Sequence, residues 1–202
     1  YHSNDPDIFN FPDELFDDIY QADAIILETD ITELMDDDRY FDHSGFNFGN
    51  DIFDWIVPFS NRDRVTFTGY GSDNGRPQFI DLYFKQIADN CDKKFYPLES
   101  IEDQMSIGWN NEVDTTVEGY IETPSKEEMK QLYLEGQASK LHDYTKLSTR
   151  RYVNLYEELL TDRNLVMANG LDTLMQNQNV FCAVGAAHLM GPKGIVPILK
   201  EK

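Results

Sequence analysis

The sequence predicts an α/β fold in which a central, mostly parallel sheet is flanked by helices. Three short apolar runs have the length and composition of buried strands, and segments with helical periodicity separate them. Each run also ends on polar or glycine residues, at the end of the strand where ligands bind in open α/β sheets. The runs are AIIL before Glu28, KKFYPL before Glu99, and VFCAV before Gly185 and His188.

The helices are predicted from their start signals and from the spacing of apolar residues. The first begins at Pro12 with acids in its first turn. The last, over 162–175, is expected to direct Leu165, Ala168, Leu171 and Leu174/Met175 inward. Ser100 is a plausible cap for a helix that starts at Ile101. The remaining helices are expected over 31–35, 79–88, from Pro124 onward, and over 149–160.

Residues 36–76 differ in character from the rest and suggest a variable insert or lid. The acidic run Asp36–Asp38 lacks the spacing and glycine of a calcium loop, so a solvated surface is the simpler interpretation. Residues 40–49 are rich in Phe, Gly and Asn, as in a surface loop. A short helix over 51–57 and a strand over 65–70 are expected within the insert.

Composition excludes several classes of partner. The chain of 202 residues has 37 acidic and 17 basic residues and a net charge of -20, which disfavours nucleic acid and anionic membranes. Divalent cations and cationic substrates are electrostatically easier to bind. No apolar run reaches the roughly 18 residues of a membrane span. The two cysteines, Cys91 and Cys182, define no disulfide framework.

Candidate site residues lie at the strand ends. His188 follows a glycine turn, where it either carries chemistry or simply packs in a loop. Glu28 repeats this placement, although an acid there can also belong to the cap of the next helix, through Thr29 or Asp30. If the strands are parallel neighbours, Glu28, Glu99 and His188 converge on one crevice.

The sequence predicts different environments for Arg163 and His142. A positive charge in the first turn of a helix is unfavourable for the helix dipole, so Arg163 is a candidate to bind a carboxylate or an oxyanion. The alternative is a surface arginine paired with Asp162 or Glu158. His142 lies in a polar link between helices and is expected to face solvent.

Four segments, in this order and separation, resemble the TraB/GumN family, to which the Tiki metalloproteases and the PrgY pheromone-shutdown proteins are related. They are AIILETD, FIDLYFKQIADNCDKKFYPLESIEDQ, LTDRNLVMANGLDTLM and VFCAVGAAHLMGPKGIVPILK. Family members carry two G-x-x-H motifs. The second is Gly185 to His188, and the first would end at His2, with its glycine upstream of this chain.

The resemblance implies an erythromycin-esterase/ChaN-like fold in a single domain over residues 1–202, with the first and last strands of the family lying outside the chain. It also implies a divalent-metal-dependent, peptidase-like hydrolase, acting on a peptide or small-molecule substrate. Manganese, cobalt or zinc would suit imidazole and carboxylate ligands. His2, Glu28 and His188 are the expected ligands, Glu99 a general base or supporting acid, and Arg163 an oxyanion or carboxylate clamp.

Two other functions remain open. A metal-independent, esterase-like hydrolase would use His2 as a general base oriented by Glu28, and its activity would survive chelators. A non-enzymatic protein would bind haem or a peptide signal without turnover, as the aromatic residues over 40–53 suggest. The sequence contains neither H-E-x-x-H nor G-x-S-x-G, so a zincin and a covalent serine hydrolase are disfavoured. The resemblance favours a secreted, periplasmic or cell-envelope location, and the oligomeric state is open.

Overall fold

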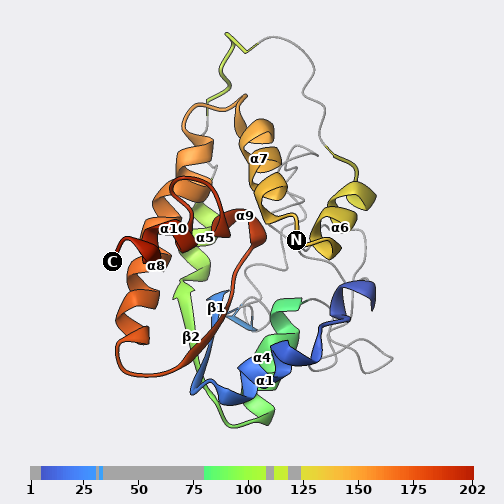
Figure 1. Ribbon diagram of the computed structural model, residues 1–202. Coiled ribbons are helices and arrows are strands. Elements are labelled where there is room, and N and C mark those ends of the chain that lie inside the picture. The colour runs from blue at the N-terminus through green and yellow to red at the C-terminus, as the bar shows by residue number, and fades with distance from the viewer. Residues whose placement is uncertain (1–5, 31, 34–79, 108–111, 118–123) are drawn as a thin grey trace. The chain divides into compact units, whose positions relative to one another are not determined.

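The computed structural model describes residues 6–30, 32–33, 80–107, 112–117 and 124–202 (Figure 1). The chain divides into two compact units, which are described separately. The strand unit comprises His2–Pro97 and Asn179–Ala183, and the helical unit comprises Leu98–Gln178 and Val184–Lys202. The predicted lid, with its helix over 51–57 and its strand over 65–70, lies outside the described residues.

The strand unit contains the small parallel sheet that the apolar runs predicted. The central strand is β1 (Ala24–Thr29), which lies between β2 (Lys94–Glu99) and β3 (Val180–Ala183). β1 pairs with β3 in parallel, with Ile25 opposite Phe181 and Leu27 opposite Ala183. The predicted α/β class is therefore confirmed.

Two helices form the core of the strand unit with one face of β1. These are α1 (Asp13–Gln21), which follows the 3-10 turn η1 (Pro6–Phe9), and α4 (Ile80–Asn90). Burial of each large aliphatic or aromatic side chain contributes about 1.5–3 kcal/mol, so this cluster stabilises the described part of the unit. Its buried members are Ile19, Ile25, Leu27, Phe84 and Ala88.

A lysine secures the end of α1. Lys93 Nζ donates hydrogen bonds to the backbone oxygens of Ala22, at 2.6 Å, and Tyr20, at 3.0 Å. Carbonyl groups at a helix C-terminus lack intrahelical partners and carry partial negative charge, so a cation stabilises them. Lys93, which precedes β2, thereby links that strand to the C-terminus of α1, the helix before β1.

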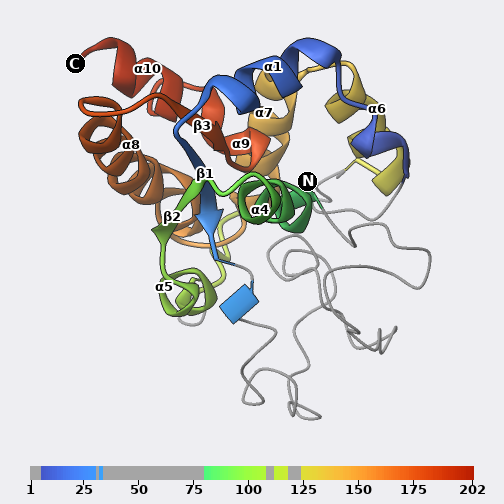
Figure 2. The ribbon, with the colours of Figure 1, turned by 90° about the horizontal axis from the view of Figure 1, so that it is seen from below.

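The described part of the helical unit contains α-helices and a π-helical turn. Figures 1 and 2 show the short helix α9 beside α7, and α10 beside α8. The elements are α5 (Ile101–Ser106), α6 (Lys126–Leu134), α7 (Ala138–Thr149), the π turn η3 (Glu157–Thr161), α8 (Asp162–Met175), α9 (Ala186–Leu189) and α10 (Ile195–Lys200). In the part of the chain that the structure describes, no helix is both long and apolar enough to cross a membrane.

Serine side chains cap the N-termini of two of these helices. Ser100 Oγ accepts a hydrogen bond from the Asp103 backbone nitrogen at 3.1 Å, as the sequence predicted. Ser125 and Glu128 form a reciprocal capping box at the start of α6. Each cap satisfies a backbone N–H that has no partner within the helix, which is typically worth about 1 kcal/mol.

Two predictions about the helices are wrong. The continuous helix expected over 149–160 is absent, because α7 ends at Thr149 and Asn154 adopts a left-handed conformation with φ 63°. In α8, Ala168 and Leu171 are buried as predicted and Leu174 is half-buried, whereas Leu165 and Met175 are 53% and 52% exposed. Apolar spacing alone did not identify which of its positions are covered.

Candidate functional site

The first turn of α8 presents two buried polar residues in succession. Arg163 is 8% exposed and Asn164 is 1% exposed. The π turn η3 directly precedes them, and such turns correspond to one extra residue in a helix and recur at functional sites. Because consecutive helical residues are rotated by about 100°, the two side chains reach different partners.

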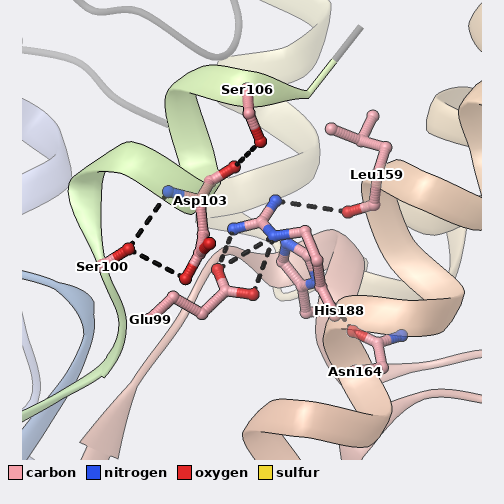
Figure 3. Close-up of polar contacts among 8 residues, drawn as sticks. Glu99, Ser100, Asp103, Ser106, Leu159, Asn164 and His188 are labelled. Atoms are coloured by element: carbon pink, nitrogen blue, oxygen red, sulfur yellow. Dashed lines mark hydrogen bonds and ion pairs between the residues drawn. The ribbon is translucent and has the colours of Figure 1, made fainter.

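Arg163 binds the carboxylate of Glu99. Its Nε lies 3.0 and 2.9 Å from the two carboxylate oxygens, and its Nη2 lies 2.6 Å from Oε2 (Figure 3). Nη1 donates to the Leu159 carbonyl oxygen at 3.2 Å. The Arg163 and Glu99 side chains are only 10% and 6% exposed, so the interpretation of Arg163 as a surface residue is wrong. A planar guanidinium that donates to both oxygens holds the acid in a fixed orientation.

Asn164 binds the imidazole of His188. Asn164 Oδ1 lies 2.7 Å from His188 Nδ1, while its Nδ2 donates to the Lys193 carbonyl oxygen at 2.8 Å (Figure 3). A carbonyl oxygen only accepts, so the contact with Lys193 assigns the orientation of the amide. Oδ1 must then accept from His188, which places the proton on Nδ1. In the neutral imidazole, Nε2 therefore carries the lone pair.

The turn that carries His188 is also held by a second histidine. His188 is 5% exposed and lies in α9, where its backbone nitrogen donates to Gly185 O at 2.9 Å. His142 Nδ1 lies 2.8 Å from the Ala187 carbonyl oxygen, and the Tyr156 hydroxyl lies 3.0 Å from His142 Nε2. The prediction that His142 faces solvent is wrong, because the residue is only 4% exposed.

Sequence reasoning therefore missed three members of this arrangement: Asn164, His142 and Tyr156. Asn164 could have been proposed from the sequence, because it follows Arg163 in the first turn of the helix predicted over 162–175. Nothing in the local sequence distinguished His142 from an exposed histidine, since its partners are 14 and 45 residues away along the chain.

Glu28 belongs to the strand unit. It is 6% exposed and occupies the same face of β1 as Ile26, whose partner in β3 is Cys182. Burial, together with the negative charge of Glu28, raises the pKa of the Cys182 thiol to about 12. Asp30 makes the cap-like contacts after the strand, because its Oδ1 accepts from the backbone nitrogen and the hydroxyl of Thr32 at 3.0 and 2.6 Å. Asp30 therefore caps the next turn.

His2 lies outside the described residues, so the meeting of His2, Glu28 and His188 stays a prediction. Within the described ranges, no group of three or more His, Cys, Asp or Glu side chains is arranged to hold a metal ion. The chemistry of His188 nevertheless fits a divalent ion. Its Nδ1–H is engaged by a protein oxygen and Nε2 is the unprotonated nitrogen, the arrangement found in histidines that ligate metals.

Comparison with known proteins identifies the family. No curated protein and no solved structure matches the chain. Residues 66–202 match the model of the TraB/PrgY/gumN family, which covers more than half of the chain and includes Glu99, Arg163, Asn164 and His188. The resemblance expected from the sequence motifs is confirmed, and the chain belongs to the TraB/PrgY/gumN family.

Proposed function

We propose that this protein is a divalent-metal-dependent hydrolase of the peptidase type, with His2, Glu28 and His188 as ligands of manganese, cobalt or zinc. The observation that carries the proposal is the hydrogen bond between His188 Nδ1 and Asn164 Oδ1. It fixes a buried imidazole in the tautomer whose Nε2 can donate electrons.

Glu99 and Arg163 support the site as a fixed pair of charges. The guanidinium donates to both oxygens of Glu99 and so holds the carboxylate in one orientation. Because both oxygens already accept hydrogen bonds, Glu99 is better suited to positioning than to proton abstraction. Arg163 fits the role of carboxylate clamp, since both edges of its guanidinium are engaged by Glu99 and by the Leu159 carbonyl.

A bound divalent ion would supply Lewis acidity toward the carbonyl group of a substrate. The residues of the chain would supply the rest: Asn164 orients His188, and Arg163 orients Glu99. The net charge of -20 favours peptides that carry positive charge, because an acidic surface attracts cationic ligands from solution.

Metal analysis of protein purified without chelators is the decisive experiment. We expect a stoichiometric divalent metal in the unaltered chain and its loss in His188→Ala. Cys91→Ala is the matched control, because Cys91 is an exposed thiol that could bind metal adventitiously, and it should retain the metal. Metal that disappears with Cys91 and persists without His188 would contradict the proposal.

Hydrolysis of a mixed peptide library, with and without EDTA, distinguishes the other functions. We expect cleavage that EDTA abolishes and that added Mn²⁺, Co²⁺ or Zn²⁺ restores. Turnover that persists in EDTA would favour the metal-independent esterase. Tight binding of haem or a peptide without turnover would favour the non-enzymatic function.

A further inference from the structure

His142 is a buried histidine whose two ring nitrogens both have assigned roles. The Ala187 carbonyl oxygen can only accept, so the 2.8 Å contact places a proton on His142 Nδ1. In the neutral ring, Nε2 then accepts from the Tyr156 hydroxyl at 3.0 Å. The edge of one ring meets the face of the other, with centroids 5.9 Å apart and planes at 82°. His142 therefore has one defined tautomer and one defined orientation.

The acceptor of His142 is the peptide group that joins Ala187 to His188. α9 has only four residues, so its carbonyl groups depend largely on partners from outside the helix. The bond from His142 restrains the backbone on the N-terminal side of His188, whereas Asn164 restrains its imidazole. Two side chains from α7 and α8 thus define the position of one histidine.

Gly191 closes the chain over the other side of the His142 ring. Its φ is +89°, and a Cβ at this position would overlap the imidazole of His142. The segment after His188 can follow this path only because Gly191 has no side chain. The ring of His142 is consequently held between the Ala187 carbonyl and the backbone of Gly191.

We propose that His142 is a positioning residue that fixes the turn Ala186–Leu189 and thereby holds His188 where Asn164 Oδ1 can accept from its Nδ1, which maintains its orientation and tautomer. Tyr156 assists by donating to His142 Nε2, which keeps Nδ1 as the nitrogen that faces Ala187. The functional importance of His188 rests on the function proposed above. The positioning itself is a property of the metal-free protein and can be tested separately.

Two substitutions at His142 separate its two contacts. In His142→Asn the amide nitrogen lies near the position of Nδ1 and can still donate to Ala187 O. In His142→Gln the longer side chain places its amide near Nε2, so the bond to Ala187 is lost. We expect His142→Asn to preserve the Nδ1–H tautomer of His188 in ¹H–¹⁵N spectra of the imidazole. His142→Gln should give a mixture of tautomers and faster exchange of the His188 amide proton.

Zn²⁺ titration provides the second readout. We expect His142→Gln to weaken Zn²⁺ binding by about tenfold or more, the usual effect of removing a group that supports a ligand, and His142→Asn to have a smaller effect. An unchanged His188 spectrum in folded His142→Gln would overturn the positioning role. Equal disruption by both variants would overturn the assignment of the Ala187 bond as its cause.

A pair of glycine variants tests the same contact if the His142 variants do not fold. Gly136 has φ +67° and open space around it, so Gly136→Ala adds backbone strain alone. Gly191→Ala adds comparable strain and also displaces the His142 ring. We expect only Gly191→Ala to alter the His188 tautomer, and a normal His188 spectrum in folded Gly191→Ala would count against the proposal. If the unaltered protein binds no Zn²⁺ while these spectral effects remain, the proposed function fails and the positioning role stands.

Discussion

Asn164 and His188 are 24 residues apart in the chain, yet Asn164 Oδ1 lies 2.7 Å from His188 Nδ1. The same amide donates to the Lys193 carbonyl, so one side chain of α8 contacts the chain on both sides of Gly191. Both atoms of the Asn164 amide are thereby used, and the residue is 1% exposed. A buried amide whose nitrogen and oxygen both bind partners is held in one orientation, because turning it over would set donor against donor at His188 and acceptor against acceptor at Lys193.

Asn164→Ala should destabilise the fold and weaken metal binding. The substitution leaves His188 Nδ1 and the Lys193 carbonyl without this partner, and each unsatisfied buried group costs about 1–3 kcal/mol. Urea denaturation measures the loss of stability. Zn²⁺ titration should show an affinity lower by about 10–100-fold. Asn169→Ala, at an exposed asparagine of the same helix that contacts Lys202, should change both quantities little. Similar results for the two variants would contradict the assigned role of Asn164.

Glu99→Gln should be among the most destabilising conservative changes. It removes the charge that compensates buried Arg163, and breaking a buried ion pair typically costs about 3–5 kcal/mol. The control is Asp172→Asn, which removes the more exposed pair with Lys202 and should cost less than about 1 kcal/mol. The double variant Glu99→Gln, Arg163→Gln should recover part of the loss, because no uncompensated charge remains. A Glu99→Gln variant as stable as Asp172→Asn would show that the pair contributes little.

Alkaline pH should destabilise the protein through Cys182. Its pKa is about 12 in the folded chain against 9.0 for an ordinary thiol, so the unfolded chain releases the proton first. The associated stability is fully present below about pH 9 and is lost as pH rises toward 12, by at most about 1.4 kcal/mol per pH unit. The measurement is the difference in unfolding free energy between the unaltered chain and Cys182→Ala from pH 8 to 10.5. A difference that does not vary with pH would refute the raised pKa.

The elements that sequence reasoning predicted well are those with strong local signals. The predicted helix over 162–175 matches α8, because Asp162 lies in its first turn and apolar residues recur with helical spacing. The strands after Asp23, Lys93 and Asn179 were identified from short, mainly apolar runs. Burial on both faces, which such runs predict, holds for β1 but not for β2 or β3. Local composition is sufficient where the hydrophobic pattern and the backbone preference agree.

The parts that could not be predicted depend on contacts between distant segments. The break after Thr149 and the π turn leave no mark on the apolar spacing, so the sequence suggested a continuous helix over 149–160. Arg163 was correctly suspected of binding a carboxylate, but Glu99 emerged as that carboxylate only once β2 and α8 were placed. His142 looked exposed because its burial is caused by α9, which lies 45 residues downstream.

The extra residue in η3 has a consequence for how the helix can vary in length. Arg163 and Asn164 are adjacent, so a deletion or insertion at Leu160 or Thr161 would rotate both by the same angle relative to the upstream backbone, including the Leu159 carbonyl. Point substitutions at Arg163 or Asn164 can disturb Glu99 or His188 one at a time. A single-residue deletion would misdirect both together, which makes chain length at this position as constrained as residue identity.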